Sequence, residues 1–176
     1  YPLMQEPTLD IDGCYPGAGR NCAGWQELTS STIPLEDIYK VVYAMPLADF
    51  EKIYDNRKIK YDNKFIEWIT KKDSAILDFL LLAKTNEYIR VKRNSRWYYP
   101  TMEIDARMTI EEVADKALSA KDARLRDRYL LQAVRALFSM QRYEDCIALW
   151  ENEASILPAD NHMRELIHPY IAGAEF

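Results

Sequence analysis

The sequence predicts an all-α protein, an α-solenoid of antiparallel helix hairpins that follows an irregular N-terminal arm. Apolar residues recur at spacings of three and four, as in residues 76–81, which places them on one helical face. No segment shows the sustained apolar and polar alternation of a β-strand. Residues 130–158 read as two short helices joined at Gln141 and Arg142, and such a hairpin buries both apolar faces only when similar units stack on it.

Composition bounds the class of protein. A chain of 176 residues with 48% hydrophobic residues is large enough for a core, as one domain or a short helical array. No run approaches the roughly 18 apolar residues of a membrane span, so no transmembrane segment is predicted. The net charge of -5 argues against nucleic acid as a partner, because phosphate binding needs a concentrated basic surface.

The chain divides into an arm and a repeat domain. Residues 1–31 are rich in Pro, Gly, Asp and Thr and show no period, which indicates the irregular arm. Residues 32–176 form the predicted helical-repeat domain. Its first helix begins at Pro34, and Pro46 ends or kinks it before a second helix with helical spacing up to Tyr54.

Further helices follow capping signals. Asp62 or Asn63 caps a short helix, and Asp73 or Ser74 caps the next one, which carries a broad apolar face. Residues 94–107 break the pattern and are the best candidate for a functional loop. After this loop, residues 109–112 (Thr-Ile-Glu-Glu) form a capping-box start. These signals predict helices through most of the repeat domain.

Apolar, small and aromatic residues recur in a regular order within residues 127–158, followed by a terminal proline. They are Leu130, Ala133, Ala136, Leu137, Tyr143, Cys146, Trp150 and Pro158. This order resembles a tetratricopeptide repeat, in which two antiparallel helices occupy about 34 residues, although Val134 stands where that family prefers glycine. The resemblance implies stacked hairpins whose concave face binds a protein or peptide.

Residues 160–176 resemble the first helix of another repeat. Asp160 can cap this helix, and Ala172, Gly173 and Phe176 match its small and aromatic positions. The unit is incomplete within the chain, so we expect either a longer solenoid or a contact with another protein through this C-terminal repeat. The chain as a whole is also similar to large bacterial helical-repeat proteins of the cell envelope, without a diagnostic motif.

Two cysteines bear on the compartment. Cys14 and Cys22 bracket a loop whose two glycines let the backbone turn. The two cysteines could therefore form a disulfide or remain as two separate thiols. A disulfide would indicate a periplasmic or cell-surface location, whereas two thiols are compatible with the cytoplasm. Two thiols without a further Cys or His nearby do not predict a metal site.

Basic and aromatic side chains meet in the loop. The candidate binding residues are Arg93, Arg96, Trp97, Tyr98 and Tyr99. Aromatic rings beside cations can stack on a sugar or hold a peptide, and ordinary packing of the loop is the alternative. We therefore interpret these residues as a possible protein, peptide or glycan contact.

The sequence shows few groups of residues that could act together in catalysis. His162 and His168 are six residues apart and so lie on different faces of a helix, whereas paired helical metal ligands prefer a spacing of four. A nucleophile at Cys146 would lack a local histidine. We predict no catalytic residues, no metal and no cofactor, and a scaffold that binds a protein or peptide. The alternatives are glycan binding through the aromatic loop and an accessory domain of a cell-wall-active enzyme.

Overall fold

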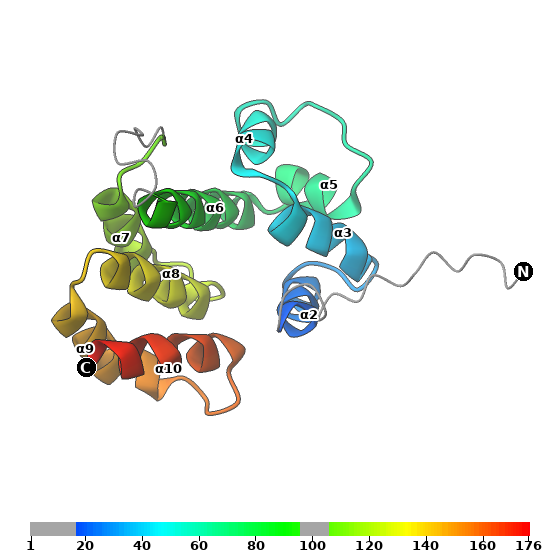
Figure 1. Ribbon diagram of the computed structural model, residues 1–176. Coiled ribbons are helices and arrows are strands. Elements are labelled where there is room, and N and C mark those ends of the chain that lie inside the picture. Colours follow the sequence, from blue (N-terminus) through cyan, green and yellow to red (C-terminus); the bar gives the residue numbers. More distant parts are fainter. Residues whose placement is uncertain (1–16, 96–105) are drawn as a thin grey trace, which may run out of the picture. The chain divides into compact units, whose positions relative to one another are not determined.

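The computed structural model describes residues 17–95 and 106–176, with the backbone alone at positions 94 and 95. Within these ranges the regular structure consists of nine α-helices, one π-helical segment and one 3₁₀ helix, without a strand (Figure 1). The predicted all-α class is therefore confirmed for this part of the chain. The chain divides into two compact units between Leu77 and Asp78, inside helix α6 (Ser74–Ser95). The boundary predicted between residues 31 and 32 lies within the first unit.

In the first unit the described residues before α6 form four α-helices. They are α2 (Ala18–Leu28), α3 (Leu35–Tyr39), α4 (Leu47–Asp55) and α5 (Lys64–Lys71). Trp25 of α2 packs edge-on against Phe65 of α5, with ring centroids 6.4 Å apart, and both side chains are buried. Asn63 caps α5 by accepting a hydrogen bond from the backbone N–H of Ile66 at 3.0 Å, which confirms one of the two predicted caps.

The irregular arm predicted for residues 1–31 is wrong over Ala18–Leu28, because these residues form α2. Ala18, Cys22 and Trp25 are its buried residues, and their spacing of four and three places them on one helical face. Three positions are too few to show a clear helical period within a stretch rich in Pro, Gly, Asp and Thr. Residues 1–16 lie outside the described part.

The helix expected from Pro34 onwards changes its hydrogen-bonding pattern midway. After α3, residues Lys40–Ala44 form a π-helical turn, and Met45 is extended. Pro46 follows as the N-cap of α4, so the predicted break at this proline is confirmed. In a π-helical turn each backbone hydrogen bond spans one residue more than in an α-helix. The spacing of apolar residues in the sequence does not reveal this difference.

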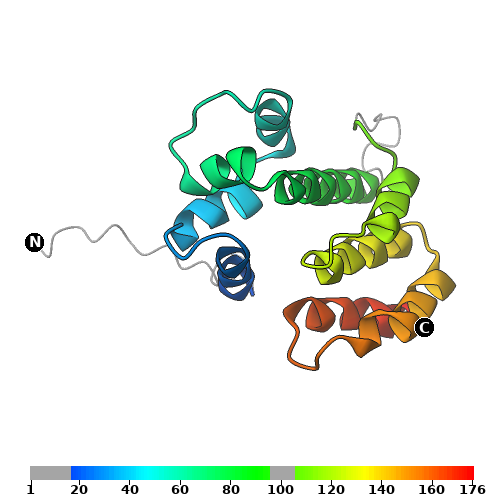
Figure 2. The same ribbon diagram turned by 180° about the vertical axis from the view of Figure 1, so that it is seen from behind.

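The second unit is organised around α8 (Arg126–Ser139). Besides α6 it contains α7 (Ile110–Ser119), α9 (Tyr143–Asn152), the 3₁₀ helix η2 (Ala154–Ile156) and α10 (His162–Ala174). α8 packs against α7, α9 and α10, and both ribbon views place it between α6 and α10 (Figures 1 and 2).

Helices α6 and α8 run in the same direction. Near their N-terminal ends Phe79 packs edge-on against Tyr129, with ring centroids 4.9 Å apart. Near their C-terminal ends Arg93 Nη2 donates to the carbonyl oxygen of Ser139 at 3.4 Å. Because residue numbers rise together along both helices, the two helices are parallel.

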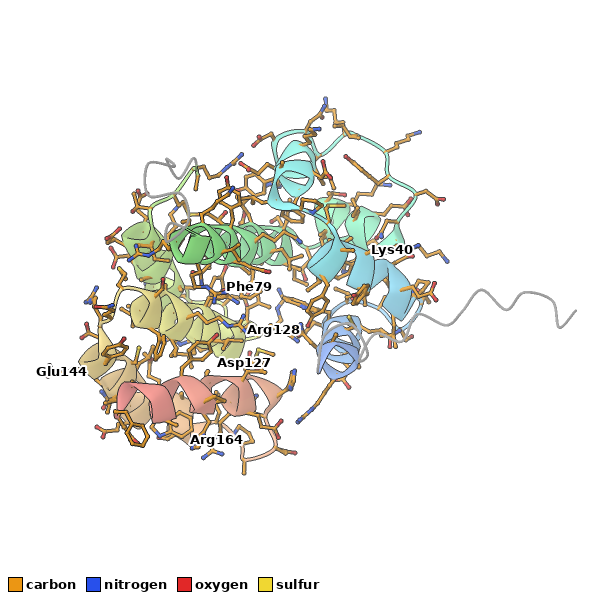
Figure 3. All side chains as sticks on the ribbon, viewed as in Figure 1. Lys40, Phe79, Asp127, Arg128, Glu144 and Arg164 are labelled. Carbon is orange, nitrogen blue, oxygen red and sulfur yellow. The ribbon has the colours of Figure 1, made fainter. Side chains whose placement is uncertain are left out.

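Helices α8 and α10 are parallel by the same criterion. Asn161 Nδ2 donates to Asp127 Oδ2 at 3.1 Å, near the N-terminal ends of both helices. At the other ends Gly173 lies against Phe138, where an added Cβ would be 3.3 Å from Phe138 Cε2. Glycine therefore permits the close approach of these helices. Figure 3 labels Phe79, Asp127 and Arg164, which lie in the N-terminal parts of α6, α8 and α10.

The capping box predicted at Thr109 is present. The Thr109 hydroxyl accepts from the backbone N–H of Glu112 at 3.2 Å, and Glu112 Oε1 accepts from the backbone N–H of Thr109 at 3.4 Å. Thr109→Ala is expected to lower the free energy of unfolding by about 1 kcal/mol, because helix α7 loses its N-cap acceptor. Urea denaturation followed by circular dichroism measures this change. Ser119→Ala at the exposed end of α7 is the control, and an equal effect of both variants would contradict the prediction.

Candidate functional site

A pocket of about 490 Å³ opens on the second unit where α6, α8 and α10 meet the turn between α8 and α9. We call it the arginine pocket. Its lining comprises Arg90, Arg93, Arg135, Phe138, Ser139, Gln141, Tyr143 and Tyr170. Three positively charged side chains and three aromatic rings thus share one cavity, and its volume lies within the usual range of ligand sites.

Buried hydrogen bonds hold α6 against α8 beside this pocket. Asn86 Nδ2 donates to the carbonyl oxygen of Gln132 at 3.1 Å and to its Oε1 at 3.0 Å. Both side chains are buried, so these bonds satisfy the Asn86 Nδ2 donor and the Gln132 acceptors, whereas Asn86 Oδ1 has no hydrogen-bond partner among the described residues. Arg90 follows Asn86 by one helical turn and Arg93 follows it by two, so α6 carries both cations along the same face.

The aromatic side of the pocket is built around Phe138. Its ring packs edge-on against Tyr143 of α9 at 5.2 Å and against Tyr170 of α10 at 5.4 Å, measured between ring centroids. Gln141, with φ of 61°, turns the chain sharply between α8 and α9 and places Tyr143 at the pocket. Three helices therefore contribute to one aromatic wall.

The cations of the pocket are incompletely paired. The Nε atoms of Arg90 and Arg135 are buried and have no hydrogen-bond partner among the described residues. Burial lowers the pKa of Arg90 below its usual value and the charge of Arg135 lowers it further, while Tyr170 and Glu87 act in the opposite direction. The two guanidinium groups therefore repel each other in a partly desolvated place. None of the described lining residues is acidic, so the pocket favours a negative or strongly hydrogen-bond-accepting group.

A second cavity, of about 420 Å³, lies on the side of α9. It is lined by Leu118, Leu137, Arg142, Asp145, Ala148, Leu149, Asn152 and Glu153. Here Arg142 Nε donates to Asp145 Oδ2 at 2.7 Å, so this cation already has its counterion. The arginine pocket is the better candidate for a ligand because the Nε atoms of Arg90 and Arg135 have no hydrogen-bond partner among the described residues.

The predicted binding residues separate into two groups. Arg93 lies on α6 and lines the arginine pocket. Arg96, Trp97, Tyr98 and Tyr99 lie outside the described residues. The proposed loop contact therefore stays a prediction for all five residues.

Sequence analysis did not predict Arg135 and Tyr170 as site residues. Arg90 belongs to the basic stretch that leads into the aromatic loop, and it precedes Arg93 by three positions and so shares its helical face. The sequence contains no comparable signal for Arg135 and Tyr170. Their places beside Arg90 result from the packing of α8 and α10.

Two of the three cysteines lie within the described residues, and both are buried. Cys22 is buried in α2, and its predicted partner Cys14 lies outside the described residues, so the disulfide stays untested. Cys146 is fully buried, as predicted, and burial raises the pKa of its thiol to about 11. His168 packs against Trp150 at 5.4 Å. Within the described ranges no group of three or more His, Cys, Asp or Glu side chains is placed to hold a metal ion.

None of the helices in residues 17–95 and 106–176 is long and apolar enough to cross a membrane. The chain matches no protein-family model, and no curated protein or solved structure matches it significantly.

Proposed function

We propose that this chain is a non-catalytic scaffold, a solenoid of tetratricopeptide-like hairpins that binds a protein or peptide in the arginine pocket. The observation that carries the proposal is the position of this pocket. It opens on a face shared by three neighbouring helices, of which α6 and α10 both run parallel to α8. In stacked hairpins, alternate helices line one continuous surface, which suits an extended ligand.

The spacing of contacts supports the repeat arrangement. The pair Asp127 and Asn161 is separated by 34 residues, and Phe138 precedes Gly173 by 35 residues. Both separations are close to the length of about 34 residues that tetratricopeptide repeats have. α8 and α9 then form one hairpin, and α10 begins the next.

The lining of the pocket supports binding of a peptide. Arg and Tyr are the residue types that dominate the energetics of protein interfaces, and both are present here in partly buried positions. Guanidinium groups donate to peptide carbonyl and carboxylate oxygens, and the ring of Tyr170 offers an apolar surface.

Capture of partners with matched variants tests this proposal. We expect the wild-type protein, used as bait in lysate from its source cells, to retain a partner in near-stoichiometric amount. Tyr170→Ala is expected to lose that partner, because it removes a ring that contacts Phe138 and lies beneath Arg135 at 5.9 Å. The measurement is quantitative mass spectrometry of the bound proteins.

Tyr54→Ala on α4 is the control for this experiment. Tyr54 also lies beneath an arginine, with Arg57 5.4 Å from its ring centroid, but it belongs to the first unit. Circular dichroism first verifies that both variants are folded. Retention of the partner by Tyr170→Ala, its loss from Tyr54→Ala, or the absence of any enriched partner would contradict the proposal.

Glycan binding, the accessory role in an enzyme and the cellular location remain predictions. Glycan binding depended on Trp97, Tyr98 and Tyr99, which lie outside the described residues. The role as an accessory domain of a cell-wall-active enzyme and the periplasmic or cell-surface location also remain predictions.

A further inference from the structure

We infer that the arginine pocket receives an oxyanionic group of the bound peptide, a phosphate monoester or a carboxylate, held by Arg90, Arg93 and Arg135. This inference rests on the proposed function and names the chemistry of the ligand at that same site. Three guanidinium groups from two parallel helices converge there on one cavity of about 490 Å³.

Charge is the first argument. The described lining contains three cations and no acid, so the pocket carries a local positive charge although the whole chain has a net charge of -5. Partial burial of these cations is costly, and repulsion between Arg90 and Arg135 adds to that cost, while Glu87 and a hydrogen bond with Tyr170 offset part of it at Arg90. An anion between these groups would relieve both effects, whereas a neutral ligand would relieve neither.

Hydrogen bonding is the second argument. The Nε–H groups of Arg90 and Arg135 are buried and have no acceptor among the described residues. A guanidinium group donates from Nε and Nη in one plane, at a spacing that matches two oxygens of a carboxylate or phosphate. Two such groups offer more donors than one neutral carbonyl oxygen can accept.

The neighbouring side chains leave these donors usable. Arg135 lies over the ring of Tyr170, with its Cζ 5.9 Å from the ring centroid, and a ring contact of this kind uses the guanidinium face. Arg93 uses only its Nη2 atom to donate to the carbonyl oxygen of Ser139, at 3.4 Å. The rings of Phe138 and Tyr143 pack edge-on against each other on the other side of the pocket and take none of these donors.

Nuclear magnetic resonance of the arginine Nε–Hε groups tests the inference directly. The full chain, labelled with nitrogen-15, is titrated with inorganic phosphate, with glutarate and with chloride at constant ionic strength. We expect phosphate or glutarate to shift the Arg90 and Arg135 signals along a saturating curve. Saturation by phosphate alone identifies a phosphate monoester as the preferred group, and saturation by glutarate identifies a carboxylate.

Arg142 is the internal control, because its Nε already donates to Asp145 at 2.7 Å. Its signal should stay in place during the titration. Arg135→Gln is expected to weaken the affinity for the saturating anion about tenfold or more, and Arg142→Gln should leave it within about twofold. Shifts that do not saturate, that occur equally with chloride, or that include Arg142 would overturn the inference.

The titration and the capture experiment fail independently. Saturating shifts without any captured partner would support the oxyanion site and contradict the scaffold function. A partner that depends on Tyr170, together with signals that no anion moves, would support the scaffold and overturn the oxyanion site. Because the titration uses the wild-type chain, the conclusion does not depend on whether a variant folds.

Discussion

Lys84→Met is expected to raise the free energy of unfolding at pH 7 by on the order of 2 to 3 kcal/mol. Lys84 lies on α6 with 8% of its surface exposed, and burial lowers the pKa of its ammonium group to about 8, with a smaller opposing effect of Glu87. At pH 7 the folded protein therefore holds a charge in a place that disfavours it. Methionine fills similar space without the charge.

The advantage of the methionine variant should depend on pH. The unfolded chain releases the Lys84 proton near the ordinary lysine pKa of 10.5, and the folded chain releases it near 8. Between these values the unfolded state binds more protons, so the penalty of Lys84 shrinks as pH rises. The difference between variant and wild type should be complete below pH 8 and vanish near pH 10.5.

Urea unfolding of both proteins at several pH values between 7 and 10.5 measures this difference. Tyr129 and Cys146, whose pKa values burial raises to about 12 and about 11, titrate in both proteins and cancel in the comparison. Lys116→Met, at an exposed position on α7, should change stability by no more than about 0.5 kcal/mol. A loss of stability at pH 7, or a difference that stays constant with pH, would show that the charge of Lys84 is compensated in the folded state.

Leu130→Ala is expected to lower the free energy of unfolding of the second unit by about 3 kcal/mol. Leu130 lies on α8, the helix that packs against α7, α9 and α10, and only 2% of its surface is exposed. Removing its side chain leaves a cavity that the neighbouring helices cannot close without moving. The first unit should keep its stability, because the division into compact units lies between Leu77 and Asp78.

Hydrogen exchange with mass spectrometry separates the two units. Amides in α7, α8 and α9 should exchange faster in the variant, whereas amides in α2 and α5 should exchange at the wild-type rate. Leu118→Ala at the end of α7, where 38% of the leucine surface is exposed, is the control and should have a much smaller effect. Equal acceleration in α2 and α5 would mean that the chain unfolds as one cooperative unit.

Local capping chemistry was the most reliable part of the prediction. The box at Thr109 and the cap at Asn63 each join residues three positions apart, so the sequence contains the whole interaction. At α10 the same reasoning selected Asp160, but the side chain of Asn161 accepts from the backbone N–H of Arg164 at 2.9 Å. Adjacent capping residues differ by one position, and tertiary contacts such as that of Asn161 with Asp127 decide between them.

The sequence by itself determined the helical class, the break at Pro46 and the break between two helices at Gln141, because helical period, proline and caps act over a few residues. Only the tertiary structure decided which helices lie side by side. Arg90 and Arg135 are 45 positions apart in the chain, and α6 and α8 bring them to one pocket through contacts such as Asn86 with Gln132. A binding site made of residues from several helices depends on packing between segments that are distant in the sequence. Residue patterns within a single helix do not show which other helix it will pack against.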